Sequence, residues 1–531
     1  MDYELGVPAI LRRAETLHGP KEIVTRLPDR SFHRYTYADF GRRARQLADA
    51  LQKLGYKDST RVATLCWNHY QHLEVYFGVP ISGNVVHTLN LRLHPGDLSY
   101  IAGHAGDRIL IVDESLLPLY EGFKDSAPFE HVVVIGNAPE GTISYEELLA
   151  GGDPWFQPPT IDEREAAVMC YTSGTTGQPK GVLYSHRAIA LHTLASCMNG
   201  TLGLSETDVA LPVVPMFHAN AWGYPFTCTL VGAKQVFPGP FLDPPSLLEA
   251  LEQEGVTMTA GVPTIWLGML QLLDAEPDKY DLSKIRCMVV GGSAAPRSLI
   301  EGFEKRHGIK VLHAWGMTEM CPLGTVSDLT ADLREQPEEI QFAYRARQGT
   351  PAPFVELRAR GENGLVSWDG ETMGELEVRG VWIASSYYED DSESGRWTDD
   401  GWFATGDIVT IDHRGYIEIQ DRTKDVIKSG GEWISSVLLE NTLMGHPAVA
   451  EAAVIAVPDE KWQERPAAIV VFREGQSATP DELREYLAPH FAKWQLPERF
   501  EFVDEIPKTA VGKFRKTALR ELYAKEPAAT P

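Results

Sequence analysis

Residues 171–181 read Tyr-Thr-Ser-Gly-Thr-Thr-Gly-Gln-Pro-Lys-Gly, which places three glycines, four Ser or Thr hydroxyls and one lysine within eleven positions. Glycines let backbone N–H groups close around a polyanion, hydroxyls donate to phosphate oxygens, and a lysine adds a point charge. The composition therefore predicts a loop that cradles a triphosphate. It is not a Walker A loop, because Lys180 follows a proline and no Ser or Thr comes after it.

A Gly/Ser/Thr run of this kind also fits a flexible linker, and the flanking sequence decides between the two. Residues 166–170, Ala-Ala-Val-Met-Cys, predict a buried strand that enters the loop. Residues 182–186, Val-Leu-Tyr-Ser-His, continue as ordered structure without further low-complexity sequence. The run therefore joins two ordered elements, as a binding loop does.

Length and composition predict a soluble protein with at least two domains. A chain of 531 residues is longer than one hydrophobic core usually supports. Its content of 43% hydrophobic and 23% charged residues is typical of globular proteins. The net charge of −25 argues against nucleic acid or an anionic membrane as the main partner. Local Lys, Arg and backbone N–H groups must therefore hold any phosphorylated ligand.

Cysteine usage and the N-terminus predict a cytoplasmic protein. The six cysteines are scattered without CxxC spacing, which favours reduced thiols. The first residues, Met-Asp-Tyr-Glu-Leu, lack the basic and apolar regions of a signal peptide. The longest apolar stretch, residues 211–233, contains three prolines, so we expect no transmembrane segment.

Alternating strand and helix patterns predict an α/β fold. Thr36 is a helix N-cap candidate, and apolar residues recur at helical spacing from Phe40 to Leu54. Continuous apolar runs then predict strands of a mostly parallel sheet covered on both faces. These runs lie at residues 61–66, 109–112, 132–135 and 287–290, with a helix expected at about residues 69–79.

The character of the sequence changes twice toward the C-terminus. Residues 356–416 contain short β segments broken by Gly, Asp and Trp, which predicts a small β subdomain. A compact α+β unit is expected from Arg422 onward, with strands at residues 452–457 and 467–471 and a helix near 481–487. We therefore expect an N-terminal domain at residues 1–421 and a C-terminal domain at residues 422–531.

Five further motifs follow the loop in order along the chain. They are Gly291-Gly-Ser-Ala-Ala-Pro296, Trp315-Gly-Met-Thr-Glu319, Thr405-Gly-Asp407, Asp421-Arg-Thr-Lys-Asp-Val-Ile-Lys428 and Pro507-Lys-Thr-Ala-Val-Gly-Lys513. Together with the loop they resemble the adenylate-forming superfamily, which contains acyl-CoA synthetases, luciferases and peptide-synthetase adenylation domains. The pattern is most similar to bacterial medium- and long-chain fatty acyl-CoA synthetases.

The resemblance implies ATP, Mg²⁺ and coenzyme A as ligands and a small carboxylic acid as substrate. It implies that Lys513, His218 and Glu319 are catalytic and that Thr172 and Glu319 hold the metal, a hard cation suited to oxygen ligands. By itself, each of these residues also fits an ordinary structural or solvated position. The nucleotide- and CoA-binding residues that it implies are Thr172, Ser173, Gly174, Thr175, Thr176, Gly177, Lys180, Gly292, Ser293, Ala294, Trp315, Gly316, Met317, Thr318, Asp407, Arg422, Lys424, Lys428, Gly430 and Trp433.

Two tryptophans depart from the family's pattern. Trp315 stands where many members have tyrosine, so it can stack on adenine but offers no phenol hydroxyl. Trp433 stands where many members have a smaller residue. Its bulk fits either a gate on the ATP or CoA path or a packing contact between domains.

The acid is expected to bind near residues 216–222, Met-Phe-His-Ala-Asn-Ala-Trp, which resemble the acyl-pocket segment of fatty acyl-CoA synthetases. The substrate residues implied are His218, Ala219, Trp222 and Gly292. The segment lacks the aspartate with which amino-acid-activating relatives pair the substrate ammonium, so that class is disfavoured. A ligase for a short or thioether acid, such as 3-methylmercaptopropionate, shares the same motifs and stays open, and a non-catalytic nucleotide-binding protein is the remote alternative.

A second half-reaction, acyl transfer to CoA, is implied by the same resemblance. The C-terminal domain would rotate about Asp421, so that Lys513 leaves the site and the loop at residues 429–433 enters. The resemblance also implies a homodimer.

Overall fold

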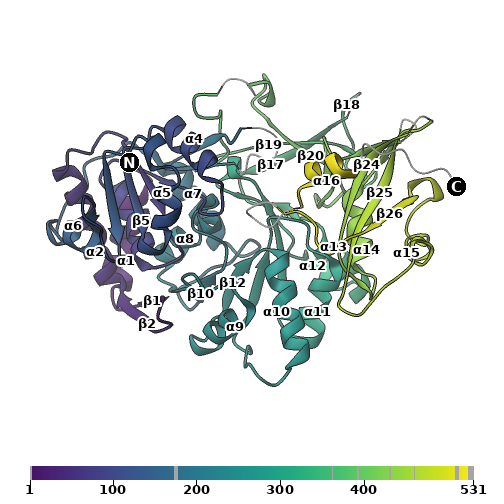
Figure 1. The fold of residues 1–531 in the computed structure, drawn as a ribbon, viewed down its shortest axis with the longest axis horizontal. Coiled ribbons are helices and arrows are strands. Elements are labelled where there is room, and N and C mark those ends of the chain that lie inside the picture. The colour runs from purple at the N-terminus through teal and green to yellow at the C-terminus, as the bar shows by residue number, and fades with distance from the viewer. Residues whose placement is uncertain are drawn as a thin grey trace.

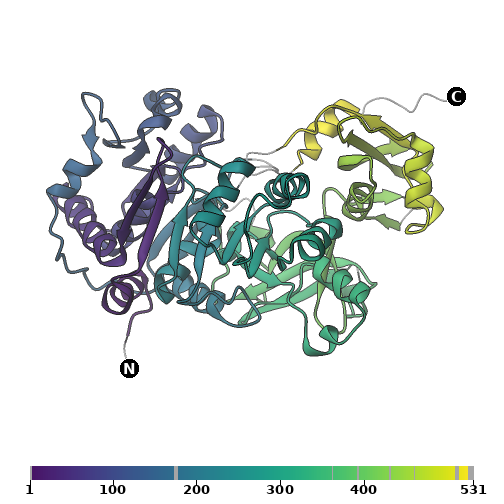
Figure 2. The same cartoon turned by 90° about the horizontal axis from the view of Figure 1, so that it is seen from below.

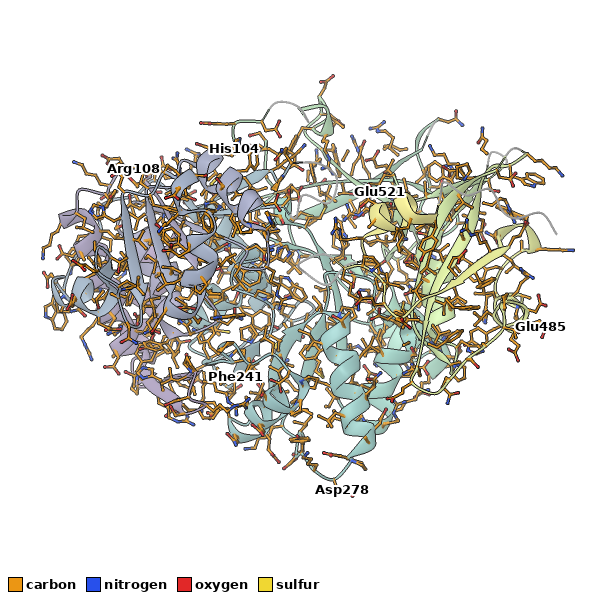
Figure 3. The ribbon with its side chains drawn as sticks, in the orientation of Figure 1. His104, Arg108, Phe241, Asp278, Glu485 and Glu521 are labelled. Atoms are coloured by element: carbon orange, nitrogen blue, oxygen red, sulfur yellow. The ribbon has the colours of Figure 1, made fainter. Side chains whose placement is uncertain are left out.

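The structure is a computed structural model that describes residues 3–172, 178–361, 363–390, 394–429, 432–459, 461–508 and 514–523. The chain runs from the N-terminal sheets at one end of the molecule to the C-terminal α+β region at the other (Figure 1). Figure 3 marks Arg108 near the first end and Glu485 at the second. None of the described helices is both long and apolar enough to cross a bilayer.

A seven-stranded sheet carries the phosphate-loop candidate. All neighbouring strands are parallel except β8 and β9, which flank residues 172–180 and run antiparallel. In spatial order the strands are β7 (Ile143–Ser144), β6 (His131–Ile135), β5 (Ile109–Asp113), β3 (Arg61–Leu65), β4 (Val85–Thr88), β8 (Ala166–Tyr171) and β9 (Gly181–Ser185). The buried strand predicted before the loop is therefore confirmed.

A nine-stranded sheet supplies the other main wall of the site. Its central strands are parallel, and antiparallel strands lie at both edges. The spatial order is β16 (Thr350–Pro351), β15 (Leu323–Val326), β14 (Val311–Gly316), β13 (Cys287–Val290), β12 (Met258–Gly261), β10 (Val209–Pro212), β11 (Lys234–Phe237), β1 (Glu22–Arg26) and β2 (Phe32–Thr36). The apolar run at residues 287–290 is fully buried in it, as a covered parallel strand should be.

Helices pack against these sheets, as their apolar spacing predicts. In α2, Thr36 and Asp39 form a reciprocal capping box, and Phe40, Ala44 and Leu47 are buried on one face. The helices of this part are α1 (Val7–His18), α2 (Tyr37–Lys53), α3 (Tyr70–Ile81), α4 (Pro95–Ala105), α5 (Leu117–Glu121), α6 (Tyr145–Ala150), α7 (His186–Cys197), α8 (Tyr224–Val231), α9 (Pro244–Gln253), α10 (Pro263–Ala275), α11 (Arg297–His307), α12 (Ala331–Arg334) and α13 (Glu338–Ala346).

The predicted β subdomain is an antiparallel five-stranded sheet. Its strands are β18 (Gly364–Leu365), β17 (Val355–Gly361), β19 (Gly374–Gly380), β20 (Phe403–Ile411) and β21 (Ile417–Arg422). Strands β20 and β21 pair Asp407 with Arg422 and Ile408 with Asp421. The pairing brings the hinge candidate Asp421 to the same edge as Asp407 and Arg422, the two residues that the family resemblance implies for the ribose of ATP.

The C-terminal region is an α+β unit with its own apolar core, which includes Leu439, Val454 and Leu483. In Figure 2 it lies at the opposite end of the molecule from α1 and α2. Its elements are β22 (Ile427–Ser429), β23 (Glu432–Ile434), α14 (Ser436–Met444), β24 (Val449–Asp459), β25 (Gln463–Phe472), α15 (Pro480–Leu487), β26 (Arg499–Phe502) and α16 (Lys516–Tyr523). The strands and the helix predicted here are present, so the α/β class with an α+β C-terminal region is confirmed.

Candidate active site

A cavity of about 800 Å³ lies where the N-terminal sheets, the β subdomain and the C-terminal region meet. Most of the residues predicted from sequence line it. They are Thr172, Lys180, His218, Ala219, Trp222, Gly292, Ser293, Ala294, Trp315, Gly316, Met317, Thr318, Glu319, Asp407, Asp421, Arg422 and Lys424. Motifs that are up to 250 residues apart in sequence thus share one cavity.

Two predicted residues lie elsewhere. Lys428 and Trp433 face each other in the β22–β23 hairpin and do not line this cavity. Lys428 is a strand residue in this arrangement, and its predicted role toward the nucleotide stays a prediction. Seven other predicted residues fall outside the described part of the chain, namely Ser173, Gly174, Thr175, Thr176, Gly177, Gly430 and Lys513.

Backbone hydrogen bonds fix the base of the loop that connects β8 to β9. The Thr172 amide donates to the Lys180 carbonyl at 2.9 Å, and the Lys180 amide donates to Thr172 Oγ1 at 3.1 Å. The Lys180 side chain is directed over the ring of Tyr387, with 5.0 Å between Nζ and the ring centroid. Both ends of the loop are thus held at the cavity wall.

The glycine-rich turn after β13 forms a second wall beside Trp222. Gly292 adopts φ +80, which favours glycine. At Gly291 a Cβ atom would lie 2.8 Å from the Ala314 carbonyl oxygen and 3.1 Å from Trp222 Cη2. The indole therefore packs directly on the turn, at the carboxyl end of a parallel strand where ligands bind in such sheets.

Residues 219–223 form a left-handed turn that the sequence did not reveal. Ala219, Asn220, Ala221 and Trp222 have φ values of 41, 56, 47 and 55, and Gly223 has φ 81. A left-handed conformation costs about 1–2 kcal/mol for each non-glycine residue, so surrounding contacts must impose it. The Ala221 side chain is fully buried, and Asn220 Oδ1 accepts from the Cys170 thiol at 3.4 Å. This turn aims Trp222 at Gly291.

Two other nucleotide-binding candidates, Arg422 and Trp315, hold the Asp407 side chain. Arg422 Nε lies 2.6 Å from Asp407 Oδ1, and the indole Nε1–H of Trp315 donates to Oδ2 at 3.1 Å. The Asp407 side chain is buried while Arg422 is partly exposed. Trp315 thus replaces the lost phenol with an N–H donor that orients this carboxylate.

Glu319 is oriented by a residue that sequence reasoning missed. The phenol of Tyr387 donates to Glu319 Oε1 at 2.6 Å, and the Ala384 amide donates to the Glu319 carbonyl at 2.8 Å. Glu319 is only 4% exposed yet lines the cavity. A carboxylate has acceptor sites beyond the one that Tyr387 uses, so the donor set of Glu319 and Thr172 fits Mg²⁺, which binds few protein oxygens together with phosphates.

A family sequence model described as "AMP-binding enzyme" matches residues 11–388, and one described as "AMP-binding enzyme C-terminal domain" matches residues 438–513. The chain belongs to the AMP-binding enzyme family. Over 98% of its length it is 51% identical to a long-chain-fatty-acid–CoA ligase of Thermus thermophilus, of which 96% is covered. It is 44% identical to a 3-methylmercaptopropionyl-CoA ligase of Ruegeria lacuscaerulensis, with 98% of both chains covered.

Solved structures of family members have the same fold. The anthranilate CoA ligase AuaEII in complex with anthranoyl-AMP superposes with a TM-score of 0.88 at 27% identity, covering 98% of both chains. ATP-bound MatB from Rhodopseudomonas palustris gives a TM-score of 0.83 at 25% identity, covering 98% of this chain and 99% of that one. The large N-terminal region and the α+β C-terminal region are thus the family's own arrangement.

A buried charged cluster surrounds the hinge candidate Asp421. Asp421 Oδ2 accepts from the Ser436 amide at 2.7 Å and from its hydroxyl at 2.6 Å. Lys516 Nζ, on α16, lies 2.7 Å from Glu440 Oε1 on α14. Burial raises the pKa of Asp421, and burial raises the pKa of Glu440 to about 7 against the opposing effect of Lys516.

The ammonium of Lys516 thus interacts with two buried carboxylates, those of Glu440 and Asp421. Burial alone would lower the pKa of Lys516, but Glu440 and Asp421 outweigh it, and the net pKa is raised. Lys516 is therefore the charged member of the cluster. Its single charge faces both acids, and burial still leaves the pKa of each carboxyl raised.

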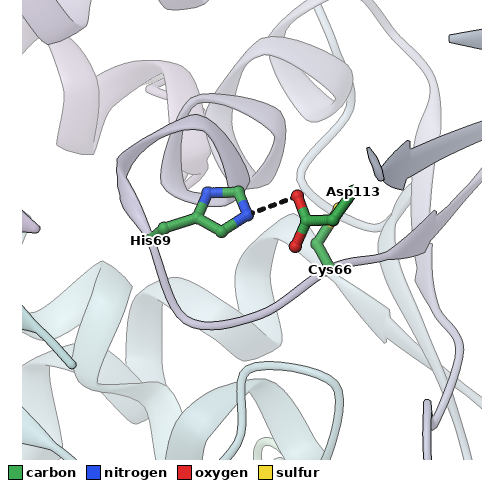
Figure 4. Close-up of side chains that lie close together, drawn as sticks. All are labelled: Cys66, His69 and Asp113. Atoms are coloured by element: carbon green, nitrogen blue, oxygen red, sulfur yellow. Dashed lines mark hydrogen bonds and ion pairs between the residues drawn. The ribbon is translucent and has the colours of Figure 1, made fainter. Parts of the chain in front are cut away.

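Cys66, His69 and Asp113 bring three potential metal-ligand atoms within 4.8 Å of one another (Figure 4). Hydrogen bonds occupy them. His69 Nδ1 accepts from the His72 amide at 3.1 Å, which leaves the proton on Nε2 to donate to Asp113 at 2.8 Å. Burial raises the pKa of the Cys66 thiol well above its ordinary value. The group therefore lacks the free imidazole nitrogen and thiolate that a metal site needs, and it joins β3 to β5 instead.

Proposed function

We propose that this AMP-binding enzyme is an ATP-dependent fatty acid–CoA ligase for medium- to long-chain acids, which forms an acyl-adenylate and then a CoA thioester. One observation carries the proposal. The cavity of about 800 Å³ combines phosphate-loop, ribose and carboxylate candidates with an apolar wall of Trp222, Leu202 and Leu267. A polar nucleotide end beside an apolar end suits an acyl chain that reacts with ATP.

For the first half-reaction, we propose that the Thr172–Lys180 loop binds the β- and γ-phosphates. Asp407 accepts from the ribose hydroxyls, and Trp315 and Arg422 hold its carboxylate in place. Glu319 and Thr172 would hold Mg²⁺, which offsets phosphate charge when bound. Lys513 would bridge the acid and the α-phosphate. No protein nucleophile is required, so the residues act by positioning and charge stabilisation.

For the second half-reaction, we propose that the C-terminal domain rotates about Asp421 and that CoA attacks the acyl-adenylate. The positions of Lys428 and Trp433 support this reading, because both lie away from the cavity in the present arrangement. The proposed domains are residues 1–421 and 422–531. The two family matches leave residues 389–437 between them, and Asp421 lies in that interval. Limited proteolysis in the presence and absence of ATP should report changed access to this segment.

Acid selection should depend on the pocket behind Trp222. A ligase for a short or thioether acid is the second candidate, supported by the 44% identity to the 3-methylmercaptopropionyl-CoA ligase of Ruegeria lacuscaerulensis. Initial rates of acyl-CoA formation across a series of acids separate the two. We expect turnover of octanoate and palmitate. Product from three- or four-carbon acids alone would reject the fatty-acid proposal.

Exchanging Trp222 tests the same pocket. Trp222→Ala removes the indole from the Gly291–Gly292 turn and should shift the preferred acid toward longer or bulkier chains. Leu194→Ala is the matched control, because Leu194 is 50% exposed and does not line the cavity. An unchanged chain-length profile in Trp222→Ala would remove this residue from the acyl pocket.

Replacing Lys513 tests whether the protein catalyses acyl-AMP formation or only binds ATP. We expect Lys513→Ala to lose acyl-AMP formation while it still transfers the acyl group from supplied acyl-AMP to CoA. Full acyl-AMP formation by Lys513→Ala would contradict the proposed mechanism. We also propose a cytoplasmic homodimer on the basis of family resemblance, which light scattering and cell fractionation test.

A further inference from the structure

The Glu319 carboxylate is connected to a small network centred on Tyr387. The Tyr387 hydroxyl donates to Glu319 Oε1 at 2.6 Å and accepts from Arg396 Nη1 at 2.9 Å. Its ring faces Lys180 Nζ at 5.0 Å from the centroid. Tyr387 is only 4% exposed and belongs to none of the motifs that the sequence singled out.

Arg396 extends this network to the ribose-site strand. Its Nε donates to the Ala404 carbonyl at 3.0 Å, and its Nη2 donates to the Thr405 carbonyl at 2.7 Å. Both carbonyls belong to the start of β20 and lie two and three residues before Asp407. A rigid guanidinium fork thus holds the backbone of that strand and the phenol of Tyr387 at fixed spacing.

Tyr387 therefore contacts groups from two separate motifs, and Arg396 links its phenol to a third. Lys180 ends the phosphate loop, Glu319 is the carboxylate suited to the metal, and Thr405 precedes the ribose-site aspartate. A hydrogen-bonded partner fixes the orientation of a ligating carboxylate and tunes its affinity for the metal. A free carboxylate on a short 3₁₀ turn would instead sample several rotamers at a cost in entropy on binding.

We propose that Tyr387 is a positioning residue that sets Glu319 for the metal–nucleotide complex, with Arg396 holding Tyr387. The inference rests on the proposed function. It goes beyond it by assigning an effect on metal affinity to Tyr387, a cavity-lining residue that is not one of the proposed metal ligands. Glu319 and Lys180 both line the cavity, and Tyr387 contacts the two of them there.

Tyr387→Phe tests this assignment, because it removes the hydroxyl and retains the ring that faces Lys180. Affinity for Mn²⁺ with a non-hydrolysable ATP analogue, measured by electron paramagnetic resonance, should fall about 10- to 100-fold. The Mg²⁺ concentration for half-maximal acyl-AMP formation should rise by a similar factor. Transfer of the acyl group from supplied acyl-AMP to CoA should stay within about twofold of wild type, because it uses no metal–phosphate contact.

Tyr388→Phe is the matched control. Tyr388 is the next residue along the chain, and its hydroxyl accepts from Arg61 Nη2 at 3.2 Å. This variant should retain wild-type Mn²⁺ affinity. If Tyr387→Phe folds poorly, Arg396→Gln provides a second test, since it removes the bond to the phenol from the other side and should weaken Mn²⁺ binding in the same direction.

Two outcomes would overturn the assignment. The first is unchanged Mn²⁺ affinity in a folded Tyr387→Phe protein. The second is an equal loss in both half-reactions, which indicates a general structural role. A wild-type protein that binds Mn²⁺ with the ATP analogue but forms no acyl-AMP would reject the proposed function alone, and the Mn²⁺ comparison would still decide the role of Tyr387.

Discussion

Replacing Glu440 by glutamine should remove a pH dependence from the stability of the C-terminal region. Burial raises the pKa of Glu440 to about 7 from an ordinary 4.5. An acid whose pKa is higher in the folded state stabilises the fold fully below its unfolded pKa, and that stabilisation is lost as the pH rises through the folded pKa. The difference of about 2.5 between the two pKa values corresponds to at most about 3.4 kcal/mol, of which about 1.4 kcal/mol is lost above about pH 6. Charge compensation by Lys516 reduces both figures.

The assay is hydrogen exchange with mass spectrometry on peptides that cover α14 and α16, at about pH 6 and about pH 8 with intrinsic rates corrected. The opening free energies of the wild type should decrease from about pH 6 to about pH 8, while those of Glu440→Gln should change less. Glu485→Gln, on the exposed face of α15 (Figure 3), is the control and should behave like wild type. A wild-type stability that rises with pH relative to Glu440→Gln would refute the reasoning.

Three further predictions concern the site and its surroundings. Trp315→Phe should raise the KM for ATP by about tenfold, because it removes the N–H donor to the Asp407 carboxylate. In Trp315→Tyr the KM for ATP should stay above that of the wild type, because the indole N–H is missing there too. Gly291→Ala should lower the free energy of unfolding by about 1–3 kcal/mol, seen as a lower melting temperature, whereas Gly103→Ala has open space and should not. Dialysis against a chelator should leave the melting temperature unchanged, since the atoms of the Cys66 cluster are already hydrogen-bonded; a marked loss restored by zinc would contradict this.

Local sequence predicted the elements that carry the site. The N-cap at Thr36, the apolar runs of β5, β6 and β13, and the shift to short β segments after residue 355 all appear as expected. These features depend on neighbours within a few residues, where hydrophobic spacing and capping act directly. The order of the motifs then predicted which positions would share a cavity.

Other features of the site depend on contacts that local sequence does not encode. Tyr387 reaches Glu319 across 68 positions of sequence, and Trp315 reaches Asp407 across 92. The left-handed turn at residues 219–223 opposes the intrinsic preference of Ala, Asn and Trp, so no local rule predicts it. The site of Lys428 and Trp433 depends on how the C-terminal region is oriented, which a linear motif cannot specify.

The sequence by itself therefore indicated the family through the order of its motifs, and the α/β architecture through its apolar runs. It also indicated a phosphorylated ligand, because glycines, hydroxyls and a lysine in one loop are groups that bind phosphate. Only the tertiary structure decided how those groups are held. Three contacts join segments that are distant in sequence. Tyr387 lies between Glu319 and Arg396, Trp222 packs on Gly291, and Lys516 pairs with Glu440 near Asp421. Their geometry follows from the packing of sheets and domains around the cavity, which sets the distances between side chains that the chain itself keeps far apart.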